Sequence, residues 1–194
     1  GIPKTTIQLK EVSYTGQKGV IGIIGAGNFT KMTLLPALKG SGAQYKYIVS
    51  KGGINSTALA QKHGFSHSTT DLEAVLHDKE VDLVLITTRH NLHASMTVKC
   101  LEAGKHVFVE KPLALNNDEL DKVIKAHQKS GKTVMVGFNR RFSPHAERMK
   151  VLLGTSQMNV IATMNAGFIP ANVWVQDMHV GGGRIIGEAC HFID

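Results

Sequence analysis

The sequence contains only two cysteines among its 194 residues, and it has no long hydrophobic run. Its longest apolar stretches, residues 20–26, 81–86 and 107–109, are far shorter than the roughly 20 residues that a membrane-spanning helix needs. We therefore exclude a transmembrane protein and expect no membrane partner. Cys100 and Cys190 are too few and too far apart for a disulfide framework or a zinc-binding motif, which favours a reduced, cytoplasmic chain.

Acidic residues are absent from residues 12–70, a stretch that contains six lysines. The formal net charge of +7 is concentrated there, whereas the rest of the chain is nearly balanced. The lysines are isolated, with neither an arginine-rich run nor interleaved aromatic residues, so we expect no nucleic-acid partner. A small ligand rich in phosphate fits the same charge with less surface.

Short apolar segments alternate with helical patterns through most of the chain. They lack the in–out alternation of a half-exposed sheet, which indicates that both faces of the sheet are covered. Strands that alternate with helices in this way predict an α/β fold with a doubly wound parallel sheet. The expected strands are residues 20–25, 45–50, 66–68, 81–86, 106–109 and 134–137, and the expected helices are residues 28–39, 55–63, 71–77, 91–103 and 117–130.

The rhythm of the sequence changes after Arg141. A helix at residues 144–153 followed by a long strand at residues 159–168 predicts the beginning of a second domain. Residues 1–19 are polar without a clear period, which is typical of a linker or a boundary segment. Residues 185–194 read as the opening of an amphipathic helix that stops without a cap. We expect a boundary segment at 1–19, a first domain at 20–141 and part of a second at 142–194, in a fragment of a longer polypeptide.

The sequence G-A-G-N-F-T at residues 25–30 follows the first strand and opens the first helix. In that setting Gly25 permits a tight turn and Gly27 lets the backbone approach a pyrophosphate, while the helix N-terminus supplies N–H donors. Thr30 replaces the third glycine of the G-x-G-x-x-G pattern. We predict nucleotide contacts at Gly25, Gly27, Asn28 and Phe29. Glycine-rich loops on α/β sheets also occur in methyltransferases, so the motif alone leaves the class of nucleotide open.

The end of the second strand favours NADP over NAD. NAD-selective sites usually carry Asp or Glu about 20 residues beyond the loop, where the carboxylate accepts from the ribose 2′-hydroxyl. Here the strand ends at Ser50 and Lys51, with no carboxylate nearby in the sequence. Ser50 can donate to a 2′-phosphate, and Lys51 can neutralise it.

Two further segments carry residues suited to chemistry. Glu110 and Lys111 follow a strand, and ligands bind at the carboxyl ends of parallel strands in such sheets. A lysine there can stabilise an alkoxide-like transition state. Near the end of the chain, three glycines precede a helix on which Glu188 and His191 share one face, and histidine is the usual proton-transfer residue near neutral pH. Taken alone, the first segment is more often a surface turn and such a histidine more often structural.

In these segments the sequence resembles the glucose–fructose oxidoreductase/inositol dehydrogenase/MocA (GFO/IDH/MocA) family. The resemblance implies an N-terminal Rossmann domain, then an α+β domain whose open sheet commonly serves as a dimer interface, and hence a homo-oligomer. It also implies NAD(P)-dependent hydride transfer at a secondary alcohol or ketone of a sugar, cyclitol or related small molecule. The segments that carry the resemblance are residues 25–30, Thr87 and Thr88 with His93, and residues 103–107, 110–112, 136–142 and 181–194.

The resemblance also implies individual roles. Lys111 matches the family's catalytic lysine, with a cis peptide bond to Pro112, and His191 matches its acid–base histidine. The family often has Asp at the position of Gly187, and the adjacent Glu188 is the nearest replacement, although one residue along a helix lies about 100° around it. Besides the loop, Ser50 and Lys51, the expected cofactor contacts are Thr87, Thr88, His93, Glu110 and Lys111.

Other features concern the surroundings of the site. Trp174 and Asp177 precede the glycines and are expected to border a substrate pocket, although ordinary packing explains Trp174 equally well. Arg89, His90 and His93 follow the fourth expected strand and are expected to face the cofactor or the substrate. His90 and His93 lack an evident third ligand, so we expect no metal. Residues 181–192 look like a subgroup of larger proteins in which this module follows a zinc-type alcohol dehydrogenase-like domain. The alternative on the same fold is a non-catalytic dinucleotide-binding sensor; the absence of Asp at 187 leaves room for it, whereas the catalytic pair argues against it.

Overall fold

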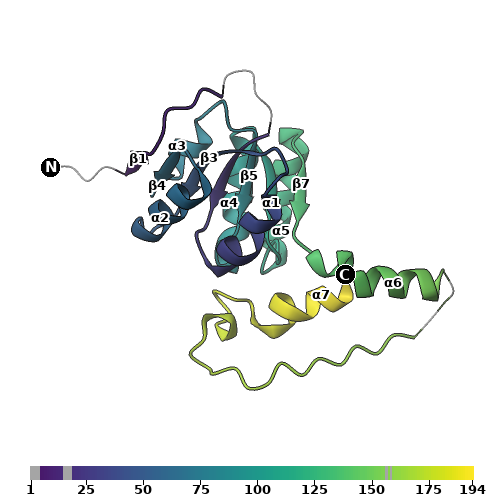
Figure 1. Ribbon diagram of the computed structural model, residues 1–194. Coiled ribbons are helices and arrows are strands. Elements are labelled where there is room, and N and C mark those ends of the chain that lie inside the picture. The colour runs from purple at the N-terminus through teal and green to yellow at the C-terminus, as the bar shows by residue number, and fades with distance from the viewer. Residues whose placement is uncertain (1–4, 15–18, 156, 158) are drawn as a thin grey trace.

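A seven-stranded sheet forms the centre of the computed structural model, which describes residues 5–14, 19–155, 157 and 159–194 (Figure 1). The strand order is β1-β4-β3-β2-β5-β6-β7; β1 pairs antiparallel with β4, and all other neighbours are parallel. Numbered along the chain without β1, the parallel strands lie in the order 3-2-1-4-5-6 of a Rossmann fold. The predicted doubly wound parallel sheet is confirmed.

The elements follow the predicted alternation closely. The strands are β1 (Thr6–Gln8), β2 (Val20–Ile24), β3 (Gln44–Val49), β4 (His67–Thr69), β5 (Leu83–Ile86), β6 (His106–Val109) and β7 (Val134–Val136). The longer helices are α2 (Ile54–His63), α4 (His93–Glu102), α5 (Asn117–Ser130) and α6 (Pro144–Leu153). The shorter helical segments are η1 (Thr30–Leu34), α1 (Leu35–Leu38), α3 (Glu73–Leu76), η2 (His90–Leu92), η3 (Asn139–Phe142), η4 (Trp174–Gln176), η5 (Ile185–Ala189) and α7 (Cys190–Ile193). None of the described helices combines the length and apolar character needed to cross a bilayer.

Two apolar clusters, one on each face, hold the sheet between its helices. Side chains alternate along a strand, so Ile23 of β2 packs on one face and Ile24 on the other. Leu35 of α1 and Leu59 of α2 belong to the first cluster, whereas α3, α4 and α5 contribute to the second, for example through Leu101. The two-sided cover explains why the predicted strands are continuously apolar.

The N-terminal segment differs from the linker expected there. Residues 6–8 form β1 and add an antiparallel edge to the sheet, and Thr6 pairs with Thr69 of β4. Tyr14 is buried, and its hydroxyl donates to the Ser66 side chain (3.1 Å). Residues 1–4 and 15–18 of the expected linker lie outside the described residues.

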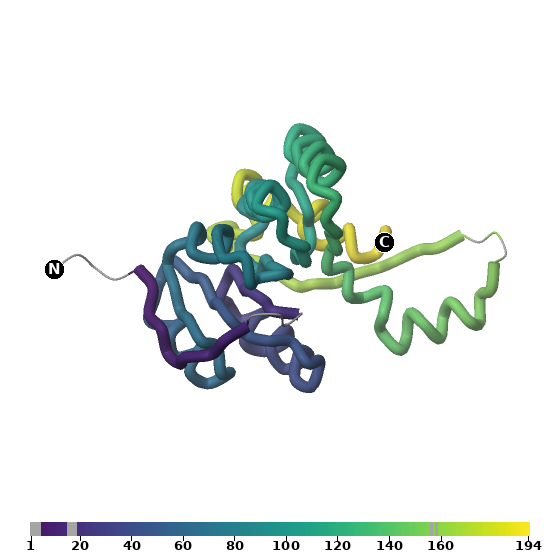
Figure 2. Tube along the Cα trace, turned by 90° about the horizontal axis from the view of Figure 1, so that it is seen from above, coloured from purple at the N-terminus to yellow at the C-terminus, as the bar shows by residue number. Residues whose placement is uncertain are grey.

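The chain after β7 leaves the sheet through η3 and α6 and returns as an extended segment (Figure 2). The strand predicted at residues 159–168 is wrong: the structure has no strand there, because no described segment offers these residues a partner for a hydrogen-bonded ladder. Ile161 and Phe168 are correspondingly exposed. The chain then reaches η4, η5 and α7, which lie against the carboxyl ends of the parallel strands.

Candidate functional site

The glycine loop lies at the carboxyl end of β2, where the strand order reverses between β2 and β5. The Gly25 N–H donates to the Val49 carbonyl at the end of β3 (2.9 Å), and Gly25 has φ of 114°. A Cβ on Gly25 would lie 2.6 Å from the Thr87 hydroxyl oxygen, so only glycine fits. A Cβ on Gly27 would meet no atom within 4 Å, which leaves that backbone open to a ligand.

A helix follows the loop directly and continues through residue 38. It begins at Asn28 and Phe29, and the Lys31 N–H donates to the Gly27 carbonyl (3.1 Å). The first N–H groups of a helix have no intrahelical acceptor, so this terminus suits a phosphate group. The open backbone at Gly27 and this helix terminus together fit the pyrophosphate of a dinucleotide.

Thr30 closes the loop from inside the protein. Its side chain is fully buried, and its hydroxyl donates to the Gly25 carbonyl (2.8 Å) and lies 2.7 Å from the Thr87 hydroxyl oxygen. The Thr87 hydroxyl is also 3.1 Å from the Gly25 carbonyl. Thr87, expected to contact the cofactor, thus uses its hydroxyl to fasten the glycine loop to the end of β5.

Ser50 and Lys51 directly follow β3, whose last residue, Val49, bonds to the glycine loop. The Ser50 N–H donates to the Thr69 carbonyl (3.0 Å), which fixes the strand end, and Lys51 is exposed. Another lysine of the acid-free stretch has a different place: Lys46 is buried, with its ammonium 2.5 Å from carboxylate oxygens of both Asp78 and Glu80. Part of the basic excess is therefore neutralised within the fold, whereas Lys51 stays available to an anionic ligand.

Glu110 follows β6 and carries an enclosed carboxylate. Its Oε1 is buried without a hydrogen-bond partner among the described residues. A Cβ on Gly137 would lie 2.5 Å from that oxygen, so glycine there makes room for the carboxylate. Burial raises the pKa of Glu110 to about 7, against the opposing effect of Lys111. An enclosed acceptor without a donor is the arrangement expected where a ligand supplies the donor.

Lys111 reaches the C-terminal segment. Its ammonium donates to the Gly187 carbonyl (2.5 Å), and its peptide bond to Pro112 is cis, as the resemblance implies. His93 is 1% exposed; its Nδ1 donates to the Pro112 carbonyl (2.7 Å), and its Nε2 lies 3.1 Å from the Thr88 carbonyl. His93, expected among the cofactor contacts, therefore ties the end of β5 to the loop that carries Lys111.

His191 lies on α7 beside the end of β7. Its ring meets Phe138 edge-on with centroids 6.3 Å apart, and its Nδ1 is buried without a partner among the described residues. Burial lowers the pKa of His191, and the cationic Lys111 and Arg140 lower it further, so the ring is neutral at pH 7. A neutral imidazole can accept a proton, which is what a general base requires.

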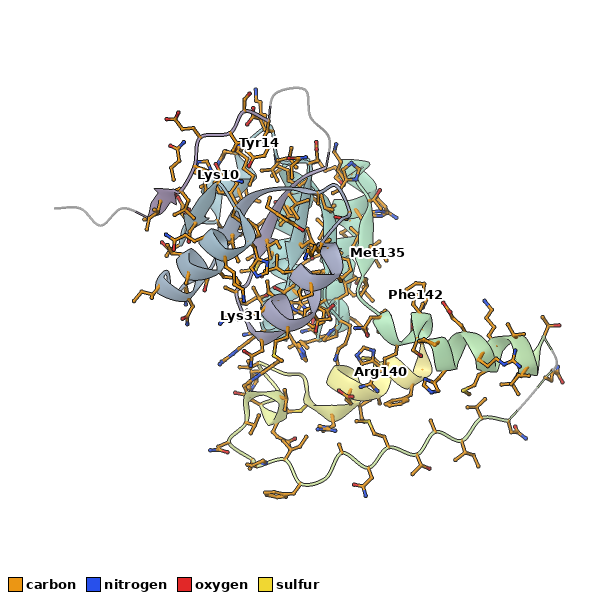
Figure 3. The ribbon with its side chains drawn as sticks, viewed as in Figure 1. Lys10, Tyr14, Lys31, Met135, Arg140 and Phe142 are labelled. Carbon is orange, nitrogen blue, oxygen red and sulfur yellow. The ribbon has the colours of Figure 1, made fainter. Side chains whose placement is uncertain are left out.

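Glu188, the expected replacement for the family's Asp, pairs with an arginine in the structure. Its Oε1 accepts from the Arg140 guanidinium (2.6 Å), and Arg140 also lies over the Phe192 ring, 4.8 Å from its centroid. Figure 3 shows Arg140 between the end of β7 and the C-terminal helix. Arg141 pairs with Asp194 next to it. These contacts hold the helix that carries His191 against η3, just beyond the end of β7.

Arg89 and His90, which follow β5, pack on the segment before the last helix. The Trp174 ring meets His90 edge-on (4.9 Å between centroids), and the Arg89 guanidinium lies 5.7 Å from the Trp174 ring centroid. Asp177 is occupied within its own turn, where its carboxylate accepts from the His179 N–H (2.8 Å). Apart from the general expectation for residues after β5, nothing in the sequence indicates that His90 and Trp174 meet.

One edge of the sheet thus collects a glycine cradle, an enclosed acceptor, a lysine and a neutral histidine. The family model described as "Oxidoreductase family, NAD-binding Rossmann fold" (GFO_IDH_MocA) matches residues 20–138. The chain belongs to this family. The predicted resemblance to this family and the NAD-binding Rossmann fold are thereby confirmed.

Relatives agree with this family assignment. The chain is 33% identical over 180 residues to the uncharacterized oxidoreductase YrbE of Bacillus subtilis, covering 90% of this chain and 52% of that protein. It is 35% identical over 92 residues to the myo-inositol 2-dehydrogenase of Thermotoga maritima, which covers 47% of this chain and 28% of the relative. The fold is also similar to the crystal structure of a probable dehydrogenase from Thermotoga maritima, with a TM-score of 0.64 and 30% sequence identity. The match covers 69% of this chain and 40% of the Thermotoga chain. The chain spans about half the length of the curated relatives that it matches over most of its own length.

Proposed function

We propose that the protein containing this chain transfers hydride between NADP and a secondary alcohol or ketone of a sugar, cyclitol or related small molecule. The observation that carries the proposal is the convergence of Lys111 and His191 beside the open glycine cradle. Lys111 donates to Gly187, four residues before His191, and also lowers the pKa of His191, so the two side chains face one region. The names of several relatives, a 1,5-anhydro-D-fructose reductase and two inositol dehydrogenases, support the substrate class.

The residues at the sheet edge fit a bound dinucleotide. Gly25 makes the tight turn, Gly27 leaves backbone open to the pyrophosphate, and the enclosed Glu110 carboxyl group offers an acceptor for a donor group of the ligand. When bound, NADP accepts or supplies the hydride. Ser50 and Lys51, at the end of β3, are the groups available to a 2′-phosphate, and the absence of a carboxylate there removes the repulsion that would exclude it.

The chain's own residues provide the proton transfer and the charge stabilisation. In the oxidation direction, the neutral His191 takes the hydroxyl proton of the substrate while hydride leaves the carbon. The Lys111 ammonium, held at the Gly187 carbonyl, donates to the same oxygen and stabilises its developing charge. Burial and the neighbouring cations keep His191 deprotonated before the reaction begins.

We also propose how this chain is divided into domains and how it assembles with further protein. We place the domain boundary near residue 141, just beyond the family match, with residues 142–194 in the substrate domain. Several large apolar side chains of this second segment are exposed, which supports their burial against further protein in a homo-oligomeric enzyme. They include Phe142, Val151, Leu152, Ile161, Phe168 and Ile193. We also propose an alcohol dehydrogenase-like module upstream in the same polypeptide, and this rests only on the resemblance of residues 181–192 to a subgroup of larger proteins.

Turnover of the whole protein tests the proposed function. NADP⁺ and NAD⁺ are supplied with myo-inositol, D-glucose and D-xylose, and NADPH or NADH formation is followed at 340 nm. We expect oxidation of at least one of these compounds, lowered at least a hundredfold by Lys111→Met, because one transition-state donor is typically worth about 10²–10³ in rate. The matched control is Lys125→Met on the exposed side of α5. Equal activity of both variants would contradict the role of Lys111.

A further inference from the structure

His90 occupies the space beside Gly187 that a side chain at position 187 would fill. A Cβ on Gly187 would lie 3.3 Å from His90 Cε1, 3.4 Å from the Gly181 carbonyl oxygen and 3.6 Å from His90 Nδ1. The same Gly187 supplies the carbonyl that accepts from the Lys111 ammonium. One residue therefore separates the His90 imidazole from the catalytic lysine.

The orientation of the His90 ring is fixed on several sides. Its Nδ1 lies 2.8 Å from the Gly181 carbonyl oxygen, and because a carbonyl only accepts, Nδ1 carries the hydrogen. The Trp174 ring packs edge-on against it at 4.9 Å, and the His93 ring lies 5.7 Å away. The next residue adds a backbone bond, from the Asn91 N–H to the Val180 carbonyl (3.1 Å). The ring is held by contacts that do not involve Nε2.

Nε2 of His90 is left as a free acceptor. Burial lowers the pKa of His90, and the neighbouring His93 and Lys111 lower it further, whereas the Gly181 carbonyl opposes the shift. A neutral ring with its hydrogen on Nδ1 carries a lone pair on Nε2. No described residue pairs with Nε2, and it is not among the enclosed polar atoms, which are Thr97 Oγ1, Glu110 Oε1 and His191 Nδ1. Nε2 thus keeps access to the outside although His90 as a whole is only 9% exposed.

We propose that His90 is a specificity-determining residue whose Nε2 accepts a hydrogen bond from a second hydroxyl group of the substrate, next to the carbon that reacts. The inference rests on the proposed function, and it narrows the substrate class to compounds with a hydroxyl group adjacent to the reacting alcohol, such as a polyol. A rigid acceptor that bound substrate covers discriminates against an analogue that lacks the matching hydroxyl, because its lone pair is then left unpaired in the complex.

Two substitutions of His90 distinguish the role of Nδ1 from the role of Nε2. In His90→Asn, the amide nitrogen lies where Nδ1 was and keeps a donor for Gly181, but nothing replaces Nε2. In His90→Gln, the longer side chain restores a polar group near the Nε2 position. For the whole protein with a polyol that it oxidises, we expect His90→Asn to raise KM about tenfold with kcat changed less than threefold, as for one neutral hydrogen bond. His90→Gln should recover part of this loss.

Discrimination against deoxy analogues gives a readout that a purely structural role would not move. The wild type should prefer the parent polyol to one of its monodeoxy analogues by at least tenfold in kcat/KM, and His90→Asn should reduce this ratio to within about threefold of one. An unchanged ratio in His90→Asn would overturn the inference, as would a loss in kcat alone. Unchanged NADPH affinity of the variant is the control for folding and for the dinucleotide site.

A measurement without substrate completes the test. Long-range ¹H–¹⁵N NMR of the histidine rings reports which nitrogen of His90 carries the hydrogen. A neutral ring with its hydrogen on Nδ1 at pH 7 supports the inference, and a hydrogen on Nε2 overturns it. If the wild type binds NADPH but oxidises no polyol, the polyol inference is overturned while the dinucleotide site stands; if it binds no dinucleotide, the proposed function fails first.

Discussion

The Thr30 hydroxyl oxygen lies 2.7 Å from the Thr87 hydroxyl oxygen, and the pair joins the glycine loop to the end of β5. Both hydroxyls reach the Gly25 carbonyl, at 2.8 and 3.1 Å. Thr30 stands where the fingerprint usually has its third glycine, and there its side chain is buried against the turn. The departure from the fingerprint is thus matched by a specific pair of hydrogen bonds.

Thr30→Val tests this pair with little change in volume. It leaves the Thr87 hydroxyl and the Gly25 carbonyl short of one partner, a loss worth about 1–3 kcal/mol for buried polar groups. We expect NADPH to bind roughly five- to tenfold more weakly, as measured by fluorescence titration, because the loop is less well held. Thr30→Ser keeps the hydroxyl and should bind within about twofold of the wild type; equal losses in Val and Ser would contradict the role of the hydroxyl.

Glu110 should make stability depend on pH. Its carboxyl releases its proton near pH 4.5 in the unfolded chain but only at about 7 in the folded protein. The unfolded state therefore binds fewer protons between these values, so the free energy of unfolding falls as pH rises through that window. Relative to Glu110→Gln, which has no titrating group there, the melting temperature of the wild type should decline from about pH 4.5 to 7 and then level off.

Thermal unfolding of both proteins between pH 4 and 8 measures this effect. A difference in melting temperature that stays constant across the range would contradict a carboxyl group that remains protonated to about pH 7. Added NADPH should reduce the decline if the ligand supplies the donor that the Glu110 oxygen lacks.

The elements around the sheet were predictable because local pattern and tertiary position agree. Strand β2 is buried along its whole length and reads as a continuous apolar run. Helices α2 and α5 end at Gly64 and Gly131, both with the positive φ that favours glycine. By contrast, β1 is three polar-flanked residues whose pairing with β4 depends on contacts about sixty residues apart.

The sequence predicts which residues form the site better than it predicts which residues they contact. The glycine loop, Glu110, Lys111 and His191 come from motifs, and all lie at the expected sheet edge. The partner of Glu188 depends on Arg140, which is 48 residues away in sequence, and no local pattern indicates it. The position of His90 depends likewise on Gly187, which is nearly a hundred residues later in the sequence. Only in the folded protein does the absence of a side chain at Gly187 leave room for the His90 ring.

Substitutions at Glu188 and His191 should differ greatly in effect. The Arg140–Glu188 pair is partly exposed, and such pairs contribute about 0–1 kcal/mol. In the whole protein, Glu188→Gln should therefore lower kcat/KM less than about fivefold, by loosening the helix that carries His191. His191→Asn should lower it about 10²–10⁴-fold, the usual contribution of a general base.

The pH profile distinguishes the two roles further. The lowered pKa of His191 places the acid limb of kcat/KM for oxidation below the ordinary histidine value of about 6.5. Glu188→Gln should shift that limb only slightly further down, because Glu188 raises the pKa of His191. A hundredfold loss in Glu188→Gln would show instead that Glu188 takes part in the proton transfer.

A fluorescence titration of this chain with NADPH and NADH side by side tests the central claim most directly. We expect NADPH to bind more tightly, and Lys51→Glu to weaken NADPH about tenfold while sparing NADH, since the substitution reverses a charge at the proposed 2′-phosphate site. Lys62→Glu, the same charge change on the exposed side of α2, is the matched control. Equal affinity for both nucleotides would contradict the NADP preference, and binding of neither would contradict the dinucleotide site itself.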